Sequence, residues 1–182
     1  MAVWLEEKGL SRDASVVAIS TLPIVELRGS IPVGIVAFGM PWWKVYLIAV
    51  AGNMIPIPVI LLVLGPLSRF CMRIAVGRKF FEWLFARTRR KSASIEKYEA
   101  LGLTIFVAIP LPVTGGWTGA MVAFLMGIPF WKAMLYILLG VMIAGVIMTA
   151  LSLMGWAGAA VAGVVLVGLV ASALAKTFKP WA

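Results

Sequence analysis

The sequence predicts an all-α integral membrane protein of two inverted repeats, each a re-entrant helical hairpin plus a transmembrane helix, with an additional C-terminal transmembrane helix. Three observations predict this fold: an apolar composition, five apolar stretches of which two are interrupted at their centres, and a repeat that relates the interrupted stretches. Of the 182 residues, 63% are hydrophobic and 13% are charged, and the mean hydropathy is +1.06. Soluble domains of this length do not have such a composition.

The apolar stretches divide one membrane domain, 1–182, into its elements. They cover residues 14–40, 42–67, 101–128, 131–154 and 157–175. A helix needs about 20 residues to span a hydrocarbon core of about 30 Å. Stretches 42–67, 131–154 and 157–175 are therefore each predicted to be one transmembrane helix, and Pro56 and Pro58 predict a kink in the first.

The other two stretches are interrupted by residues that break helices. Stretch 14–40 contains Pro23, Glu26, Arg28, Gly29 and Pro32, and stretch 101–128 contains PLPVTGG at 110–116. Each half is then about a dozen residues, or about 18 Å of helix, which is too short to span a bilayer. We expect two re-entrant hairpins, and full crossing by both stretches is the alternative that the sequence leaves open.

The segment between the two halves, residues 68–100, is strongly basic. It carries nine Lys and Arg residues against three Glu residues. The positive-inside rule places it in the cytoplasm, and the aromatic residues in KFFEWLFARTRRK favour contact with anionic lipid headgroups. A solvated loop with anchoring side chains is the alternative. The N-terminal MAVWLEEKGLSRD lacks the features of a cleaved signal peptide, so we expect none.

A repeat relates residues 14–67 to residues 101–154. VAFGMPWWK at 36–44 matches VAFLMGIPFWK at 122–132, and chance similarity between apolar segments is the competing interpretation. Further matches are Leu47 with Leu135, Gly52 with Gly140, Met54 with Met142, Ile55 with Ile143 and, upstream, Gly29 with Gly115.

The orientation of the repeats depends on how often each crosses the membrane. One hairpin plus one span crosses an odd number of times, which inverts the second repeat as in many secondary transporters. If both interrupted stretches cross fully, the repeats are parallel. The distribution of Lys and Arg leaves both arrangements open. The inverted arrangement, which we prefer, puts the basic segment and the C-terminus in the cytoplasm of a multi-pass inner (plasma) membrane protein.

ELRGSIP at 26–32, PLPVTGGWTGA at 110–120 and the Pro-aromatic-Trp-Lys end of each hairpin resemble the small multidrug export protein family, a distant relative of the DedA (VTT-domain) membrane proteins. The resemblance covers about residues 14–175. It implies paired re-entrant hairpins in inverted repeats. For the DedA relatives it implies transport or scrambling of lipids such as undecaprenyl phosphate, with proton coupling. DedA proteins carry ionisable residues in both hairpins, whereas the second hairpin here has none, so only Glu26 and Arg28 carry over.

The residues themselves support a site at Glu26 and Arg28. A charge at the centre of a bilayer costs about 2.5 to 3.5 kcal/mol and indicates function by default. The planar guanidinium of Arg28 suits a phosphate because it can donate two hydrogen bonds. Glu26 suits a proton carrier, since its protonation would respond to the position of Arg28 or of a ligand. A static salt bridge that locks the tip is the alternative.

The helices that follow the two tips define the other candidates. The first is predicted to begin near Gly29 and Ser30, with Ser30 as cap and Pro32 in its first turn, and the second at Thr114 or Gly115. Two converging helix N-termini favour an anionic group. The remaining candidate ligand contacts are Thr114, Gly115, Gly116, Trp117 and Thr118, for which capping and packing are equally good explanations. Asn53, about 15 Å deep by helical rise, either faces the same cavity or joins helices.

These observations predict a transporter or flippase for an anionic lipid or lipid-phosphate. Export of small amphipathic cations is an alternative that the adjacent Arg28 disfavours, and a non-transporting membrane scaffold is another. We expect no enzyme activity and no cofactor or metal, because the chain has no histidine and only one cysteine, Cys71. The expected partners are membrane lipids with anionic headgroups and a small-molecule or lipid-phosphate substrate, with no nucleic acid. The small-residue face of the last helix indicates either close helix packing within the chain or a homodimer contact.

Overall fold

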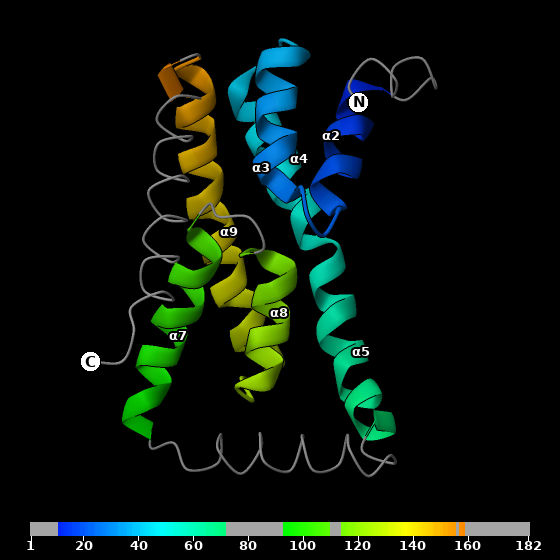
Figure 1. Ribbon diagram of the computed structural model, residues 1–182, viewed down its shortest axis with the longest axis vertical. Coiled ribbons are helices and arrows are strands. Elements are labelled where there is room, and N and C mark those ends of the chain that lie inside the picture. The colour runs from blue at the N-terminus through cyan, green and yellow to red at the C-terminus, as the bar shows by residue number, and fades with distance from the viewer. Residues whose placement is uncertain (1–10, 72–92, 110–113, 156, 159–182) are drawn as a thin grey trace, which may run out of the picture.

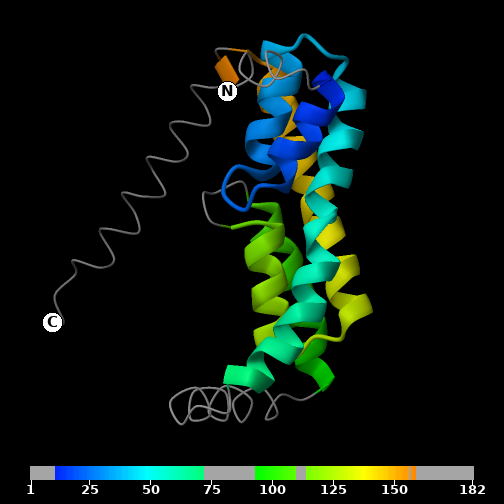
Figure 2. The same cartoon turned by 90° about the vertical axis from the view of Figure 1, so that its right-hand side faces the viewer.

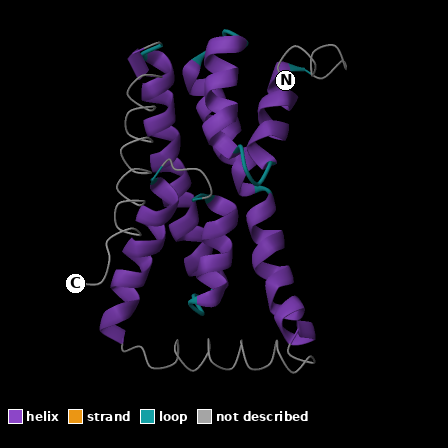
Figure 3. Ribbon diagram, in the orientation of Figure 1, coloured by secondary structure: helices purple, strands orange, loops and turns teal. Residues whose placement is uncertain are grey.

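The fold is described by a computed structural model for residues 11–71, 93–109, 114–155 and 157–158 (Figure 1). Most of the predicted basic segment and the predicted helix 157–175 lie outside the described residues. Within those residues every regular element is a helix, as Figure 3 shows. The elements are α2 (Arg12–Thr21), α3 (Glu26–Pro32), the π-helix η1 (Val33–Ala37), α4 (Trp42–Met54), α5 (Pro56–Cys71), α7 (Ala93–Ala108), α8 (Gly116–Leu125) and α9 (Phe130–Leu153).

Two helical segments are long and apolar enough to cross a membrane. They are Trp42–Leu67, which combines α4 with most of α5, and Phe130–Leu153, which is α9. The backbone bends at Ile55 between α4 and α5, so the kink predicted from Pro56 and Pro58 is confirmed. At 1.5 Å per residue, α9 extends about 36 Å, more than a hydrocarbon core requires.

The shorter helices form two pairs, α2 with α3 and α7 with α8. In Figure 1 and again in Figure 2, the pairs enter from opposite ends of the long axis, and the inner ends of their helices lie about midway along it. The interrupted stretches are thus broken where the sequence places the breaks. The placement of these pairs in a bilayer as re-entrant hairpins, and the inverted relation of the repeats, remain predictions.

The start of α3 differs from the prediction. The helix begins at Glu26, not near Gly29, and no side chain caps it. A tight turn precedes it, in which the Glu26 N–H donates to the Leu22 carbonyl, 3.1 Å away, so helical hydrogen bonding begins early. Ser30 therefore lies inside the helix, and Pro32 is its last residue and is followed by η1.

Equivalent glycines make equivalent contacts in the two halves. A Cβ on Gly52 of α4 would lie 2.9 Å from the Ser20 Cβ of α2, and one on Gly140 of α9 would lie 2.6 Å from the Val107 Cβ of α7. Each long helix thus packs closely on the first helix of the hairpin before it, because its glycine has no side chain. Each long helix is also preceded by an exposed proline, Pro41 or Pro129, at its N-cap.

The second helix of each hairpin packs against the long helix of the other half: α3 contacts α9, and α8 contacts α5. Buried aliphatic side chains such as Leu27, Ile57 and Ile137 form the core between these elements. Large apolar side chains on the outer faces of α5 and α9 are exposed, as a lipid-facing surface requires. The cross-packing brings the two hairpin tips together.

Candidate site at the hairpin tips

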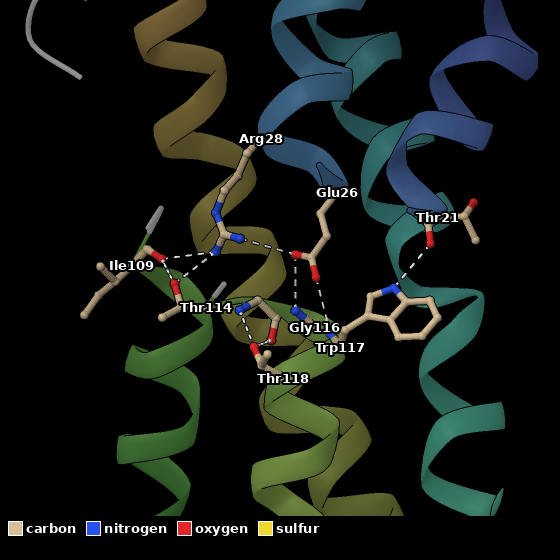
Figure 4. A network of polar contacts seen from close by, with 9 residues as sticks. Thr21, Glu26, Arg28, Ile109, Thr114, Gly116, Trp117 and Thr118 are labelled. Carbon is tan, nitrogen blue, oxygen red and sulfur yellow. Dashed lines mark hydrogen bonds and ion pairs between the residues drawn. The ribbon is translucent and has the colours of Figure 1, made fainter. Parts of the chain in front are cut away.

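Glu26 lies at the tip of the first hairpin and reaches the second hairpin with its side chain. It is buried, with 2% of its surface exposed. Its Oε2 accepts a hydrogen bond from the Gly116 N–H at 3.4 Å, and its Oε1 accepts one from the Trp117 N–H at 3.3 Å (Figure 4). These N–H groups open α8 and have no acceptor within their helix. Glu26 therefore caps α8 from the other half of the protein, at the positive end of its dipole.

Arg28 reaches the other broken end of the second hairpin. Its Nη1 lies 3.5 Å from Glu26 Oε2, so the two charges form the ion pair that the sequence left as one of two possibilities. Its Nη2 donates to the Ile109 carbonyl at 3.2 Å and to Thr114 Oγ1 at 3.4 Å. The Thr114 hydroxyl in turn donates to the Ile109 carbonyl at 2.9 Å. Ile109 directly follows α7, so Arg28 lies where the α7 dipole is negative.

Trp117 makes the converse contact, from the second hairpin to the first. Its indole Nε1 donates to the Thr21 carbonyl at 3.2 Å, as Figure 4 shows. Thr21 is the last residue of α2, where the final carbonyls have no helical donor. Three of the four broken helix ends are thus satisfied by a side chain of the opposite hairpin.

Two glycines allow the start of α8 to approach so closely. A Cβ on Gly115 would collide with the Glu26 carboxylate. A Cβ on Gly116 would lie 2.9 Å from Asn53 Oδ1. The Thr118 hydroxyl accepts a hydrogen bond from the Gly115 N–H at 2.9 Å, so Thr118 caps its own helix and does not reach the charged pair.

Asn53 lies near the end of α4, beside the Glu26 carboxylate and the start of α8. Its side chain is completely buried. Neither the Nδ2 nor the Oδ1 of its amide has a hydrogen-bond partner within the described part of the chain. A buried amide is usually hydrogen-bonded, so Asn53 is available for a further contact.

Most of the predicted candidates gather at this contact between the tips, but two do not. Gly29 faces Val25 and Ile19, within its own hairpin. Ser30 accepts a hydrogen bond from the Ser20 hydroxyl at 2.7 Å and so ties α3 to α2. The prediction that Ser30 caps a helix at the site was therefore wrong. Ser30 is buried between the helices of its own hairpin because the helix begins four residues earlier.

Two members of the network are backbone carbonyls that the sequence did not single out, those of Thr21 and Ile109. Carbonyls carry no residue-type signal. Their position could have been inferred only from the predicted helix ends, because the last carbonyls of any helix need donors.

The donors at the tips bind an anion of the protein itself, the Glu26 carboxylate. Two backbone N–H groups and a guanidinium converge on one carboxylate in a buried setting, the donor set that phosphate and carboxylate groups bind. In the described ranges, no group of three or more His, Cys, Asp or Glu residues is placed to hold a metal ion.

Comparison with known proteins adds one match. The model of a family described as "Putative small multi-drug export protein" matches residues 26–147, more than half of the chain. The matched region begins at Glu26 and includes both tips. No curated protein and no solved structure matched the chain.

Proposed function

The chain belongs to the small multi-drug export protein family, and from this premise we propose that it is a membrane exporter of an anionic amphiphile, such as a lipid phosphate. The proposed binding site is the contact between the two hairpin tips. One observation carries the proposal: the Gly116 and Trp117 N–H groups and the Arg28 guanidinium all point at the Glu26 carboxylate. In this view Glu26 occupies the place of the substrate headgroup.

This geometry allows the anionic headgroup of a substrate to replace the Glu26 carboxylate at the same donors. An incoming phosphate or carboxylate can take the same donors, and the fork of Arg28 can bind two of its oxygens at once. Glu26 then has to leave. An ionised carboxylate without donors in the membrane interior is costly, so the displaced Glu26 takes up a proton. Binding of the anion is thereby coupled to binding of a proton.

The proposed route uses the meeting of the tips from opposite ends of the molecule (Figure 1). If the hairpins are re-entrant and inverted, as we infer, movement of one hairpin opens the site to one side of the membrane. The contacts between the tips must then break in each cycle. A lipid phosphate would keep its chains against the exposed apolar faces of the helices while its headgroup passes the tips.

Export of an organic cation is the second candidate, and the family description favours it. Its anionic partner would be Glu26. For this function Glu26 has to be released from Arg28 and from α8, because its oxygens are otherwise taken up by these donors. The two candidates therefore differ in which residue binds the substrate.

Reconstitution into proteoliposomes tests both candidates. Transport of a fluorescent short-chain lipid phosphate is compared with that of ethidium, for the wild type, Arg28→Ala and Glu26→Gln. We expect transport of the lipid phosphate, its loss in Arg28→Ala, and loss of its response to a proton gradient in Glu26→Gln. Transport of ethidium alone, lost in Glu26→Gln, would support the cation exporter instead. Transport of neither probe would contradict both proposals.

A matched control comes from another ion pair. Lys44 Nζ lies 2.8 Å from Asp13 Oδ2, and both side chains are substantially exposed. Exposed pairs contribute little to stability. Lys44→Ala removes a positive charge from the same half of the protein without touching the tips, and we expect it to transport at the rate of the wild type.

A further inference from the structure

Asn53 is the polar group at the tips that the network does not use. Its amide offers one acceptor, Oδ1, and a donor, Nδ2. Both are buried and neither makes a hydrogen bond of regular geometry in the described structure, although the amide lies close enough to the Glu26 carboxylate to interact with it. It lies beside the carboxylate of Glu26 and in contact with the start of α8. The ionised Glu26 accepts from α8 and Arg28 and has no proton to donate to Oδ1.

A protonated Glu26 is complementary to this amide. A carboxylic acid has one O–H donor and one carbonyl acceptor, and a primary amide has the matching acceptor and donor. The two groups can therefore form a pair with two hydrogen bonds. A metal cation would satisfy only the Oδ1, and an apolar neighbour would satisfy neither atom.

We propose that Asn53 is the partner of protonated Glu26 during transport, with the acid O–H donating to Asn53 Oδ1 and Asn53 Nδ2 donating to the acid carbonyl. The proton comes from water on the side where the site is open, and it returns to water when Glu26 goes back to α8. Asn53 thus acts as a positioning residue that holds the neutral acid. The inference rests on the proposed exchange of anions at the tips.

Among the described side chains, one charged group lies in the surroundings of Glu26, that of Arg28 on α3. The facing part of α8 is uncharged, and so are the described side chains of α5 and α7. Lys44 on α4 pairs with Asp13 at the far end of that helix. Within the described residues, the choice of Glu26 between its ionised and its neutral form therefore depends on its own proton and on Arg28.

The composition of the chain allows a direct test on the unmutated protein. Asn53 is the only asparagine, and there is no glutamine. Protein labelled with [15N]asparagine therefore gives a single side-chain amide signal in an NMR spectrum, and that signal belongs to Asn53. We expect its chemical shift to follow pH in one titration in lipid nanodiscs, and to be independent of pH in Glu26→Gln.

A transport assay provides a second test, independent of the NMR experiment. Asn53→Leu has a similar volume and no hydrogen-bonding group. We expect it to lose the stimulation of lipid-phosphate transport by a proton gradient. Thr149→Val, which removes a buried hydroxyl that has no hydrogen-bond partner in the described structure, is expected to keep it. If Asn53→Leu does not fold, the NMR titration of the wild type still tests whether Asn53 pairs with protonated Glu26.

The outcomes separate this inference from the proposed function. A pH-independent Asn53 signal, or the same titration in Glu26→Gln, overturns the pairing of Asn53 with the acid. A titration that requires Glu26 supports the pairing even if no anion is transported, in which case only the proposed substrate fails. Transport of the anion with a proton response unaffected by Asn53→Leu contradicts the role of Asn53 and leaves the proposed function standing.

Discussion

Glu26 combines a strained backbone with a buried charge. Its φ of 48° is the one positive value at a non-glycine residue in the described ranges. Such a conformation costs of the order of 1–3 kcal/mol and persists where the surroundings hold it. The hydrogen bonds from α8 and the ion pair with Arg28 are contacts that offset it. The contacts of the Glu26 side chain therefore hold its backbone in the strained conformation, and their loss favours a different conformation of the tip.

Exchanging the charges of Glu26 and Arg28 tests whether the two residues act only as a salt bridge or also cap the helices of the second hairpin. If Glu26 and Arg28 only neutralise each other, the double variant Glu26→Arg, Arg28→Glu restores what each single variant loses. In the structure, however, the carboxylate must accept from α8 and the guanidinium must donate to the Ile109 carbonyl. We expect each single variant to lose about 3–5 kcal/mol of stability and the double variant to recover little of it. Thermal unfolding in detergent measures this, and full recovery would refute the caps.

A methyl group on Gly115 tests the same contact without removing a charge. Because the added Cβ would collide with the Glu26 carboxylate, Gly115→Ala should displace Glu26 from α8 and reduce transport of the lipid phosphate at least tenfold. Gly102→Ala in α7 is the control, since nothing lies within 4 Å of its added Cβ. A helical alanine there is expected to be neutral or to stabilise by up to about 1 kcal/mol. Equal transport by both variants would contradict the contact.

Broken helices need donors and acceptors for their ends, and each hairpin supplies them to the other. The sequence indicated the breaks, because prolines and glycines interrupt the apolar stretches. It placed the start of α8 within one or two residues, and it left open whether Glu26 and Arg28 pair or bind a ligand. It missed the start of α3, because the left-handed Glu26 replaces the glycine that such a turn normally requires. It also missed that the caps cross between the hairpins, since this depends on tertiary packing.

Trp117→Phe tests the contact that runs from the second hairpin to the first. The variant keeps the aromatic ring and the backbone N–H but removes the indole donor to the Thr21 carbonyl. We expect a loss of about 1 kcal/mol, seen as about fivefold faster hydrogen exchange at the end of α2. Trp131→Phe is the control, because Trp131 is 81% exposed. Equally fast exchange in both variants would show that the hydrogen bond does not stabilise the tip.

The two halves of the molecule repeat their contacts as well as their sequence. Gly52 and Gly140 let each long helix approach the first helix of its own hairpin, and the second helix of each hairpin packs on the other half. The alignment predicted that Gly52 and Gly140 are equivalent, but it did not predict which helices they contact. It could not predict the second relation, because exchange of partners between halves has no local sequence signal. In Figures 1 and 2, α4 and α9 begin at opposite ends of the long axis, which favours inverted repeats over parallel ones.

Labelling of the two prolines that precede the long helices decides the orientation. Pro41 and Pro129 are equivalent in the repeat and both exposed. Each is changed to cysteine in a background in which Cys71, the single native cysteine, is replaced by serine. A membrane-impermeant maleimide added to intact cells should label one position only, because inverted repeats put equivalent residues on opposite sides. By the positive-inside rule the labelled residue should be Pro41→Cys, since the basic segment lies at the other end of the α4–α5 span.

Permeabilised cells provide the control for this experiment, since both cysteines must then react. Labelling of both positions, or of neither, in intact cells would indicate parallel repeats and would place the long helices in the same direction across the membrane. The hairpins would then have to cross fully, and the tips could not admit a substrate from the two sides in turn. The result therefore bears on the transport cycle as well as on topology, because alternating access at the Glu26 and Arg28 contact requires hairpins that enter from opposite sides.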